Sequence, residues 1–320
     1  MLSVVAPAFD EADVLPSFVS RVVDVLDTTG EEWELVLVDD GSRDGTWTEI
    51  EAAASREPRV RGIRLSRNFG HQLAITAGLS VARGDGVVTM DSDLQHPPEV
   101  IPALLAAARE GNDVVYAVRS ATDAAGFWKR LSARVFYAVL NRLSSLELPE
   151  GAADYRWMSR RVVDVLLVMP ERHRFLRGLV RWAGYGQTFV EYHRSPREGG
   201  TSKYGLRRML LFAWDGVVSF SSFPLRVASV FGICVSILGW FYLVYVLAVK
   251  VFTDRAIPGW TSVTAAVLLL GGAQLVFLGI LGQYVGRMYD DVKQRPLFLI
   301  ADDTRESKEA GRAAHLGGNA

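Results

Sequence analysis

Apolar and polar residues alternate along the first 118 positions in blocks typical of strands and helices in turn. Short apolar runs bounded by polar or glycine residues predict strands, and the longer segments between them predict helices. The expected strands lie near residues 2–6, 33–39, 60–66, 86–91 and 113–118, and the expected helices near residues 12–28, 45–56, 71–82 and 98–110. This alternation predicts an α/β domain with a mostly parallel sheet covered on both faces.

The apolar pattern changes beyond residue 226. Residues 227–249 form an uncharged stretch of 23 residues, which as a helix would be about 34 Å long and exceed the roughly 30 Å hydrocarbon core of a bilayer. A second uncharged stretch, residues 256–286, follows a short loop around Asp254, Arg255 and Pro258. The pattern predicts a hairpin of two transmembrane helices.

The basic residues around this hairpin predict its orientation. They are Lys203, Arg207, Arg208 and Arg226 before the first span, and Arg287, Lys293 and Arg295 after the second. Lys250 and Arg255 lie between the spans but are fewer, so we expect both flanks and the N-terminal domain on the cytoplasmic side of the plasma membrane. Gly282 and Gly286 have the spacing of a helix-contact pair, which favours a homo-oligomer through these helices. The alternative is the general abundance of glycine in membrane helices.

Acidic residues follow two of the predicted strands directly. Asp91 and Asp93 come after the apolar residues 86–90, and Asp39 and Asp40 come after residues 35–38. In an open parallel sheet both strand ends face one crevice, where ligands of α/β folds bind. Hard oxygen ligands suit Mg²⁺ or Mn²⁺ bound to a diphosphate, whereas the alternative is a pair of solvated turns. The sequence therefore favours a nucleotide and metal site.

Composition limits the remaining possibilities. The chain has 320 residues, 49% of them hydrophobic, and its 35 basic and 36 acidic residues give a net charge of −1. These values exclude a disordered chain and give no basic excess for nucleic acid. Cys234 is the single cysteine, so no intramolecular disulfide forms. We expect no signal peptide, because residues 2–6 already have the pattern of a buried strand, and we expect a disordered tail over residues 301–320.

Four motifs resemble those of the inverting family 2 glycosyltransferases, in the same order and spacing. They are the run from Ser3 to Glu11, Asp39-Asp40-Gly41-Ser42, Arg67-Asn68-Phe69-Gly70, and the run from Asp91 to Glu99. Within that family the chain is similar, from Leu2 to about Leu299, to the polyisoprenyl-phosphate glycosyltransferases, which include bactoprenol glucosyltransferases and dolichol-phosphate mannose synthases. The resemblance implies a GT-A nucleotide-binding domain over residues 1–204, an amphipathic interfacial helix over 205–226, the hairpin over 227–286 and a cytosolic tail over 287–320.

The resemblance also implies an activity. The enzyme would transfer a hexose with inversion from a nucleoside-diphosphate sugar to undecaprenyl or another polyisoprenyl phosphate, using Mg²⁺ or Mn²⁺. UDP-glucose or a related UDP-hexose is the donor that the bactoprenol branch favours. The product would be a lipid-linked sugar donor for modifying cell-envelope glycans, and membrane lipids would surround the enzyme.

Family motifs assign the donor and cation sites position by position. Pro7, Phe9 and Glu11 would line the base pocket, and Asp39 or Asp40 would accept hydrogen bonds from the base or ribose. Asp91 would contact the nucleotide sugar. The cation would be held by Asp91, Asp93 and Gln95, and Asp93 would also be catalytic. Phe9 is often Tyr in relatives, so a hydroxyl contact is lost. Asp10 stands where Asn is usual, and we expect it to point away from the ligand. His96 is interpreted as a loop residue, because hard cations prefer oxygen ligands.

The acceptor side is expected to rest against the bilayer. Residues 127–146 have apolar residues at helical spacing and cations between them, which favours an interfacial helix over an ordinary helix packed on the sheet. Arg119, Lys129 and Arg130 are candidates for binding the acceptor phosphate. Arg197 and Lys203 bracket a glycine pair, and the family pattern favours a loop that closes over the diphosphate rather than a plain linker.

Asp154 corresponds to the carboxylate proposed as the general base in the family. A phosphate monoester has a second pKa of about 6, so much of the acceptor has no proton to remove at neutral pH. We therefore expect Asp154 to orient the acceptor or complete the charge pattern. Two other functions remain open: a processive polysaccharide synthase, for which Arg181 and Trp182 fit the acceptor motif but Gly178 replaces its glutamine, and a non-catalytic membrane scaffold or lipid-flipping subunit.

Overall fold

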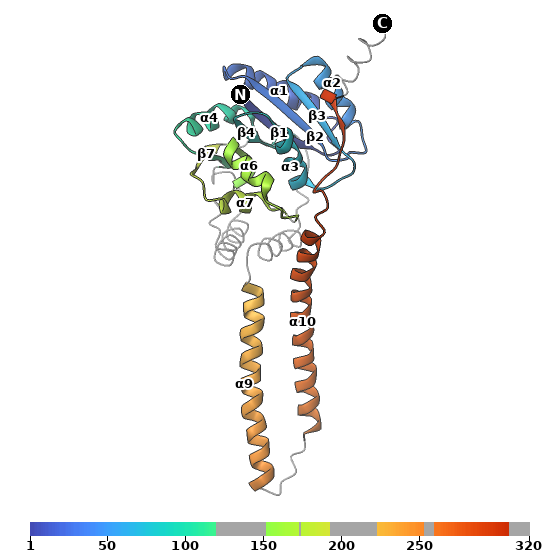
Figure 1. Ribbon diagram of the computed structural model, residues 1–320, viewed down its shortest axis with the longest axis vertical. Helices are drawn as coiled ribbons and strands as arrows, with labels where there is room; N and C mark the ends of the chain where they lie inside the picture. The colour runs from blue at the N-terminus through green and yellow to red at the C-terminus, as the bar shows by residue number, and fades with distance from the viewer. Residues whose placement is uncertain (120–151, 173, 193–222, 253–258, 307–320) are drawn as a thin grey trace. The chain divides into compact units, whose positions relative to one another are not determined.

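The structure is a computed structural model that describes residues 1–119, 152–172, 174–192, 223–252 and 259–306 (Figure 1). Contacts along the chain divide it into two compact units. One unit comprises residues 1–141, 146–205 and 295–320, and the other comprises residues 142–145 and 206–294. The first unit therefore contains both ends of the chain.

An eight-stranded sheet forms the centre of the first unit (Figure 1). In chain order its strands are β1 (Leu2–Ala8), β2 (Trp33–Asp39), β3 (Val60–Leu65), β4 (Gly86–Thr89), β5 (Val114–Arg119), β6 (Ala152–Ser159), β7 (Gln187–Tyr192) and β8 (Ile300–Asp303). Their spatial order is β7-β5-β6-β4-β1-β2-β3-β8. β6 and β8 run antiparallel to their neighbours, and the other strands share one direction. The predicted mostly parallel sheet is confirmed.

Helices connect the strands and cover both faces of the sheet. They are α1 (Leu15–Thr28), α2 (Thr46–Arg56), α3 (His71–Val81), the 3₁₀ turn Pro98–Val100 with α4 (Ile101–Arg109), α6 (Arg160–Val168) and α7 (Leu176–Trp182). The first four agree with the helices expected from the alternation, with small differences at their ends. Residues of the β-strands alternate between the two faces, so each strand contributes apolar side chains to both helical layers.

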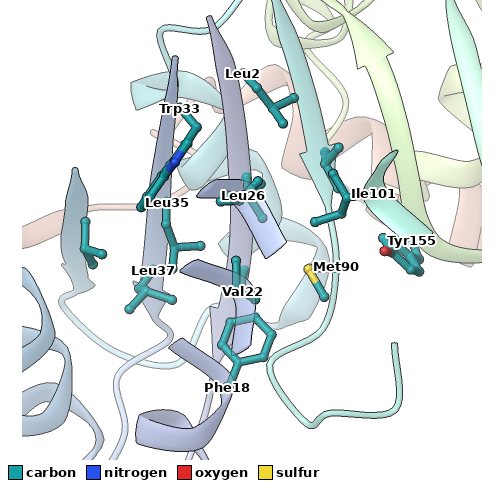
Figure 2. Close-up of a cluster of buried hydrophobic side chains, with 14 of the residues drawn as sticks. Leu2, Phe18, Val22, Leu26, Trp33, Leu35, Leu37, Met90, Ile101 and Tyr155 are labelled. Atoms are coloured by element: carbon teal, nitrogen blue, oxygen red, sulfur yellow. The ribbon is translucent and has the colours of Figure 1, made fainter. Parts of the chain in front are cut away.

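Helix α1 illustrates how the pattern specifies packing. Proline occupies its first turn, where the missing N–H group costs nothing, and its apolar residues recur every three or four positions. Phe18, Val22 and Leu26 consequently form one fully buried face. Figure 2 shows these three side chains in one hydrophobic cluster with Leu35 and Leu37 of β2.

Helix α3 packs on the opposite face and approaches the sheet closely at Gly78. A Cβ atom at this position would lie 2.2 Å from Cγ1 of Val5 and 3.0 Å from Cγ2 of Val38. The absent side chain thus lets α3 lie directly on β1 and β2. The start of this helix is thereby fixed next to the carboxyl ends of those strands.

The C-terminal segment returns to the sheet as β8, beside β3. Arg61 donates to Asp303 at 2.6 Å, and the Gly62 amide donates to the Thr304 hydroxyl at 2.9 Å. Both members of the Arg61–Asp303 pair are almost fully buried. The expectation that the tail is disordered from Ala301 onward is therefore wrong for residues 301–306, because β8 pairs with β3 and Asp303 is paired inside the fold.

The second unit contains α9 (Phe223–Phe252) and α10 (Trp260–Val292), helices of 30 and 33 residues. Within the residues that the structure describes, no helix combines the length and the apolar character needed to cross a membrane, so the predicted hairpin of two transmembrane helices is not confirmed. The expected amphipathic helices over 127–146 and 205–226 lie outside the described residues, apart from residues 223–226 at the start of α9.

The buried pair at β8 predicts a large effect of a single substitution. We expect Asp303→Ala to lower the free energy of unfolding by about 3–5 kcal/mol, because Arg61 is left charged and buried without its partner. Thermal or denaturant unfolding of the purified full-length chain measures this effect. The neighbouring Asp302, half-exposed and 3.8 Å from Arg64, is the control, and its alanine variant is expected within about 0.5 kcal/mol of wild type. Equal, small effects of both substitutions would show that the buried Arg61–Asp303 pair does not stabilise the fold.

Candidate active site

The candidate site lies at the carboxyl ends of β1, β2 and β4. The parallel register places Ala8 beside Asp39 at the ends of β1 and β2, and Thr89 ends β4 beside β1. Because β6 is antiparallel to β4, its first residues reach the same edge, and the Thr89 hydroxyl donates to the Asp154 carbonyl at 2.6 Å. Asp91 follows β4 by two residues. The topology thus gathers carboxylates from distant parts of the chain at one edge of the sheet.

Asp40 joins two loops at this edge. Its Oδ1 accepts the Phe69 amide at 2.7 Å and its Oδ2 accepts the Gly70 amide at 2.9 Å. Gly41 has a positive φ of 70°, and a Cβ there would lie 2.4 Å from the carbonyl carbon of Arg67. Only glycine fits this close approach. The two motifs therefore act together, and they fix where α3 begins.

Asp39 has a different environment from Asp40. It is fully buried, and its Oδ1 accepts the Ser42 amide at 2.8 Å. Its Oδ2 accepts no hydrogen bond from the described residues, although Nε of Arg64 lies 3.4 Å away and balances the charge. Of the two neighbouring carboxylates, Asp39 therefore retains an accepting oxygen, whereas both oxygens of Asp40 are used within the protein.

Residues beyond β1 form a second group at the edge. The Phe9 ring is 43% exposed, whereas Pro7 is buried and its carbonyl oxygen lies 2.8 Å from the Ser92 hydroxyl. The same hydroxyl is in short contact with Glu11 Oε2. Ser92 has one proton, so its hydroxyl donates to only one of these two oxygens at a time. Burial, reinforced by the charges of Asp93 and Asp91, outweighs the opposing hydrogen bond from Ser92 and raises the pKa of Glu11 to about 7.

Asp91, Asp93 and Gln95 lie on the tight loop after β4. Asp93 Oδ1 accepts the Gln95 amide at 3.0 Å, and Leu94 between them has a positive φ of 58°. Asp91 Oδ1 is buried and accepts no hydrogen bond from the described residues, and burial raises the pKa of this carboxyl. An unsatisfied buried carboxylate oxygen is an available ligand for a cation.

The donor set fits a hard divalent cation bound together with a phosphate ligand. Among the described residues, no three His, Cys, Asp or Glu side chains are grouped closely enough to hold a metal by themselves. Mg²⁺ commonly binds through one or two carboxylates and completes its shell with water and substrate phosphates. Two aspartates and a neighbouring amide oxygen therefore meet the requirement for a nucleotide-bound ion.

Two histidines flank Asp91 and have different roles. His96 is buried, stacks on Tyr155 at 5.1 Å, and its Nδ1 accepts the Asp91 amide at 3.1 Å. It supports the loop rather than facing a ligand, in agreement with the sequence interpretation. His71 begins α3, and its Nε2 lies 3.3 Å from Asp91 Oδ1 and 3.6 Å from Asp154 Oδ2. Burial alone would lower the pKa of His71, but the two carboxylates outweigh it and raise the pKa.

Asp154 is buried at the centre of a polar network. Its Oδ1 accepts hydrogen bonds from Arg156 and from Arg177 Nε, and its Oδ2 accepts from Gln72 Nε2 and Arg177 Nη2. The last three bonds measure 3.0–3.1 Å. Burial would raise the pKa of Asp154, but Arg177, His71 and Arg156 outweigh burial and hold the pKa well below its usual range. The carboxylate is therefore ionised at neutral pH.

The sequence matches a known protein family. The profile described as "Glycosyl transferase family 2" matches residues 3–167. The chain belongs to glycosyl transferase family 2. It is 41% identical to "Uncharacterized glycosyltransferase YkcC" of Bacillus subtilis (strain 168) over 98% of both chains. It is 38% identical to "Bactoprenol glucosyl transferase" of Shigella phage SfII, covering 95% of this chain and 98% of the relative.

The fold of the chain is also similar to solved structures. The glucosyl-3-phosphoglycerate synthase from Mycobacterium tuberculosis, crystallised with Mn²⁺, UDP and phosphoglyceric acid, has a TM-score of 0.47 and 20% identity, over 68% of this chain and 76% of the other. As a member of family 2, the chain is a glycosyltransferase with an α/β GT-A fold and a mostly parallel sheet.

The family assignment leaves the individual site residues to be judged from the geometry. Pro7, Phe9, Glu11, Asp39, Asp40, Asp91, Asp93, Gln95 and Asp154 are brought to one edge of the sheet. Asp10 donates its amide to the Ser42 hydroxyl and accepts the Arg43 amide, so it supports a loop. Arg119 ends β5, and only its backbone is described. Lys129, Arg130, Arg197 and Lys203 lie outside the described residues.

His71, Gln72 and Arg177 were not identified from the sequence. His71 and Gln72 directly follow the Arg67–Gly70 motif, and this position is a signal that could have pointed to them. Arg177 gives no such signal, because it reaches Asp154 only through the packing of α7. The site thus contains an arginine, Arg177, that the acidic sequence motifs do not predict.

The raised pKa of Glu11 predicts a pH-dependent difference in stability. The folded pKa of about 7 exceeds the ordinary 4.5, so wild type loses stability as pH rises between these values, because the folded state retains the proton and the unfolded state releases it. Glu11→Gln lacks this loss. We expect the melting temperature of Glu11→Gln, relative to wild type, to increase from pH 5 to about pH 7.5.

Thermal unfolding in EDTA measures this difference, since a cation at Asp91 and Asp93 would lower the pKa of Glu11. The exposed Glu51 on α2 is the matched control. Its glutamine variant should follow the wild-type pH profile. A constant difference between Glu11→Gln and wild type across this range would show that Glu11 is already ionised at low pH.

Proposed function

We propose that the enzyme transfers a hexose from a nucleoside-diphosphate sugar to a polyisoprenyl phosphate, with inversion at the anomeric carbon. The observation that carries the proposal is the pairing of opposite charges at one sheet edge. The unsatisfied Asp91 Oδ1 lies 3.3 Å from His71, and Asp154 holds Arg177 beside them. Carboxylates for a cation and side chains for a phosphate thus occur together, as a substrate containing a metal-bound diphosphate requires.

The reaction has a simple balance of bonds. An oxygen of the acceptor phosphate forms a bond to the anomeric carbon as the bond from that carbon to the β-phosphate oxygen breaks. The nucleoside diphosphate leaves with the electron pair. Attack and departure on opposite faces of the sugar invert the configuration. Because the second pKa of a phosphate monoester is about 6, the acceptor is largely a dianion at pH 7 and needs no base.

Charge stabilisation of the leaving group is the principal task of the site. Asp91, Asp93 and Gln95 are the residues that would hold Mg²⁺ or Mn²⁺, and the bound ion would act as a Lewis acid for the departing diphosphate. We further propose that Arg197 and Lys203 contact this diphosphate. At the nucleoside end, the exposed Phe9 ring would stack on the base, and Asp39 Oδ2 would accept a base or ribose hydrogen bond.

The choice of substrates follows from the relatives. Several relatives 37–38% identical over at least 93% of this chain are named bactoprenol glucosyl transferase or a homolog of it. We therefore propose undecaprenyl phosphate as the acceptor and UDP-glucose or a related UDP-hexose as the donor. Arg119, Lys129 and Arg130 would bind the acceptor phosphate. The product would be a lipid-linked sugar that serves as a donor for envelope glycans.

A lipid acceptor requires the enzyme to work at a membrane. The uncharged residues 227–249 and the exposed apolar side chains along α9, such as Ile233, Leu238 and Phe241, support a membrane-embedded second unit. We propose that α9 and α10 anchor the enzyme in the cytoplasmic membrane, with both flanks and the first unit on the cytoplasmic side. The basic flanks support this orientation.

The activity is tested with purified protein in detergent, undecaprenyl phosphate and a panel of radiolabelled sugar nucleotides. We expect transfer from a UDP-hexose in Mg²⁺ or Mn²⁺, and a loss of at least about 100-fold in EDTA or in Asp93→Ala, the scale of losing a charge-stabilising group. Asp24→Asn, an exposed substitution on α1, is the control and should retain activity. Full transfer after both metal removal and Asp93→Ala would overturn the proposed mechanism. Absence of transfer with every donor would favour a non-catalytic scaffold.

Membrane anchoring is tested separately by cell fractionation. We expect the full-length chain to stay in the membrane pellet in alkaline carbonate and to enter solution only with detergent. Helices that are inserted in the bilayer are not released by high pH. A peripheral control protein should be extracted by carbonate in the same sample. Release of the enzyme by carbonate alone would contradict the proposed anchor, whatever its transferase activity.

A further inference from the structure

A row of three charged side chains crosses β2, β3 and β8 on one face of the sheet. The register pairs Asp39 with Arg64 in the parallel β2–β3 ladder, and it pairs Arg64 with Asp302 in the antiparallel β3–β8 ladder. Paired residues of neighbouring strands project their side chains to the same face. The row therefore leads from the carboxyl end of β2, at the candidate site, to the strand that follows the second unit.

Arg64 lies between the two carboxylates and contacts both. Its Nε is 3.4 Å from Asp39 Oδ2, and its Nη1 is 3.8 Å from Asp302 Oδ2. Its guanidinium carbon also lies 6.0 Å from the centre of the Trp47 ring on α2. Asp39 is fully buried, whereas the side chains of Arg64 and Asp302 are 39% and 50% exposed. The position of the guanidinium is thus determined from three sides, by β2, α2 and β8.

The contact with Arg64 balances the charge of Asp39 without using its accepting oxygen. Asp39 Oδ1 accepts the Ser42 amide, whereas Oδ2 accepts no hydrogen bond from the described residues, Arg64 included. Burying a carboxylate is costly unless a positive charge lies nearby. A buried acceptor without a hydrogen bond gains free energy when a ligand donates to it. Arg64 therefore supplies charge and orientation to Asp39 and leaves a lone pair for a ligand.

We propose that Arg64 is a positioning residue for the donor nucleoside: it holds Asp39 in the orientation in which Oδ2 accepts an N–H or O–H group, and Asp302 holds Arg64 from the side of β8. This inference rests on the proposed function, since the nucleoside belongs to the sugar nucleotide. Uridine offers two groups of this kind, the imide N–H of the base and the ribose hydroxyls. Binding of the donor then depends on a strand that follows the second unit in the chain.

Calorimetry of UDP binding in the presence of Mn²⁺ tests the role of Arg64 without requiring transfer. The full-length variants are Arg64→Ala, Arg64→Lys, Asp39→Asn and the double variant Asp39→Asn/Arg64→Ala. Arg56→Ala is the matched control, because Arg56 is an exposed arginine in the last turn of α2. Thermal unfolding establishes that each variant is folded. If Arg64→Ala does not fold, Arg64→Gln takes its place, since it keeps a long polar side chain without the charge.

We expect Arg64→Ala to weaken UDP binding by about 10-fold, within the range for losing a hydrogen bond to a charged group. The KM for the UDP-hexose should rise by a similar factor. The kcat and the KM for undecaprenyl phosphate should stay within about threefold, because a contact to the nucleoside is the same in the ground state and the transition state. Arg64→Lys should restore part of the affinity, since it retains the charge but not the planar group. Arg56→Ala should bind UDP as wild type does.

The double variant tests whether Arg64 acts through Asp39. Asp39→Asn removes the charge that Arg64 balances, so Arg64→Ala should then weaken UDP binding by less than about threefold. Losses that multiply would show that Arg64 binds UDP independently of Asp39. Unchanged UDP binding in folded Arg64→Ala would show that Arg64 has no role in donor binding. Either result overturns the proposal.

UDP analogues identify the group that donates to Asp39. If the imide N–H donates, wild type prefers UDP to CDP, whose base lacks this hydrogen, and Arg64→Ala loses most of the preference. If a ribose hydroxyl donates, the preference for UDP over 2′-deoxy-UDP or 3′-deoxy-UDP falls instead. Preferences that remain unchanged in Arg64→Ala against all three analogues overturn the inference.

Asp302→Asn tests the contribution of β8. We expect UDP binding to be about two- to fivefold weaker, the scale of a half-exposed ion pair, and to show no further loss when Asp302→Asn is added to Arg64→Ala. An unchanged affinity in Asp302→Asn, or an equal loss with and without Arg64, overturns the link to β8.

The same measurements separate this inference from the proposed function. Wild type that binds no UDP would overturn both. Wild type that binds UDP and transfers the sugar, with Arg64→Ala unaffected, would refute the inference alone. UDP binding that depends on Arg64 in a protein without any transfer would refute the proposed transfer and support the role of Arg64.

Discussion

The candidate active site depends on one buried carboxylate that joins three elements of the chain. Asp154 on β6 accepts hydrogen bonds from Gln72 on α3 and from Arg177 at the start of α7. A buried charge of this kind is tolerated only when it is paired and its lone pairs are satisfied. The requirement therefore applies to both sides of the pair: the arginines keep Asp154 ionised, and Asp154 fixes the positions of the Arg177 and Gln72 side chains. Displacement of α7 would remove Arg177 from Asp154, and displacement of α3 would remove the hydrogen bond from Gln72.

A second constraint sets the start of α3. Asp40 accepts both the Phe69 and Gly70 amides, and Gly41 allows the backbone around Arg67 to approach closely. His71 follows immediately, so the loop geometry determines its position next to the cation side of the site. The adjacent Asp39 keeps an oxygen available because its own contacts leave Oδ2 without a hydrogen bond within the described residues. Two neighbouring aspartates thus differ in their hydrogen bonds, because Asp40 uses both oxygens to hold the loop at Phe69 and Gly70 and Asp39 does not.

The sequence predicts those features that depend on local pattern. The alternation of apolar runs predicts the strands and helices of the first 118 residues, and residues after strand ends predict where Asp91 and Asp93 gather, because parallel strands place their carboxyl ends together. It does not distinguish Asp39 from Asp40, since that difference arises from hydrogen bonds to distant amides. It also does not locate Arg177, which reaches Asp154 across 23 positions through tertiary packing.

The return of the chain as β8 was missed for the same reason. The segment 300–303 has only four residues, Ile-Ala-Asp-Asp, which is too short for an apolar alternation, and its strand structure comes from pairing with β3. In the sequence, Asp303 does not differ from the other acidic residues of the C-terminal segment. In the fold, its carboxylate pairs with the buried Arg61. Since the second unit lies between β7 and β8 in the chain, the sheet is completed only after that unit has been synthesised. The first unit is therefore not a separable N-terminal half. Without the residues that follow the second unit, β3 would lose its neighbour β8 and Arg61 would lose the buried carboxylate of Asp303.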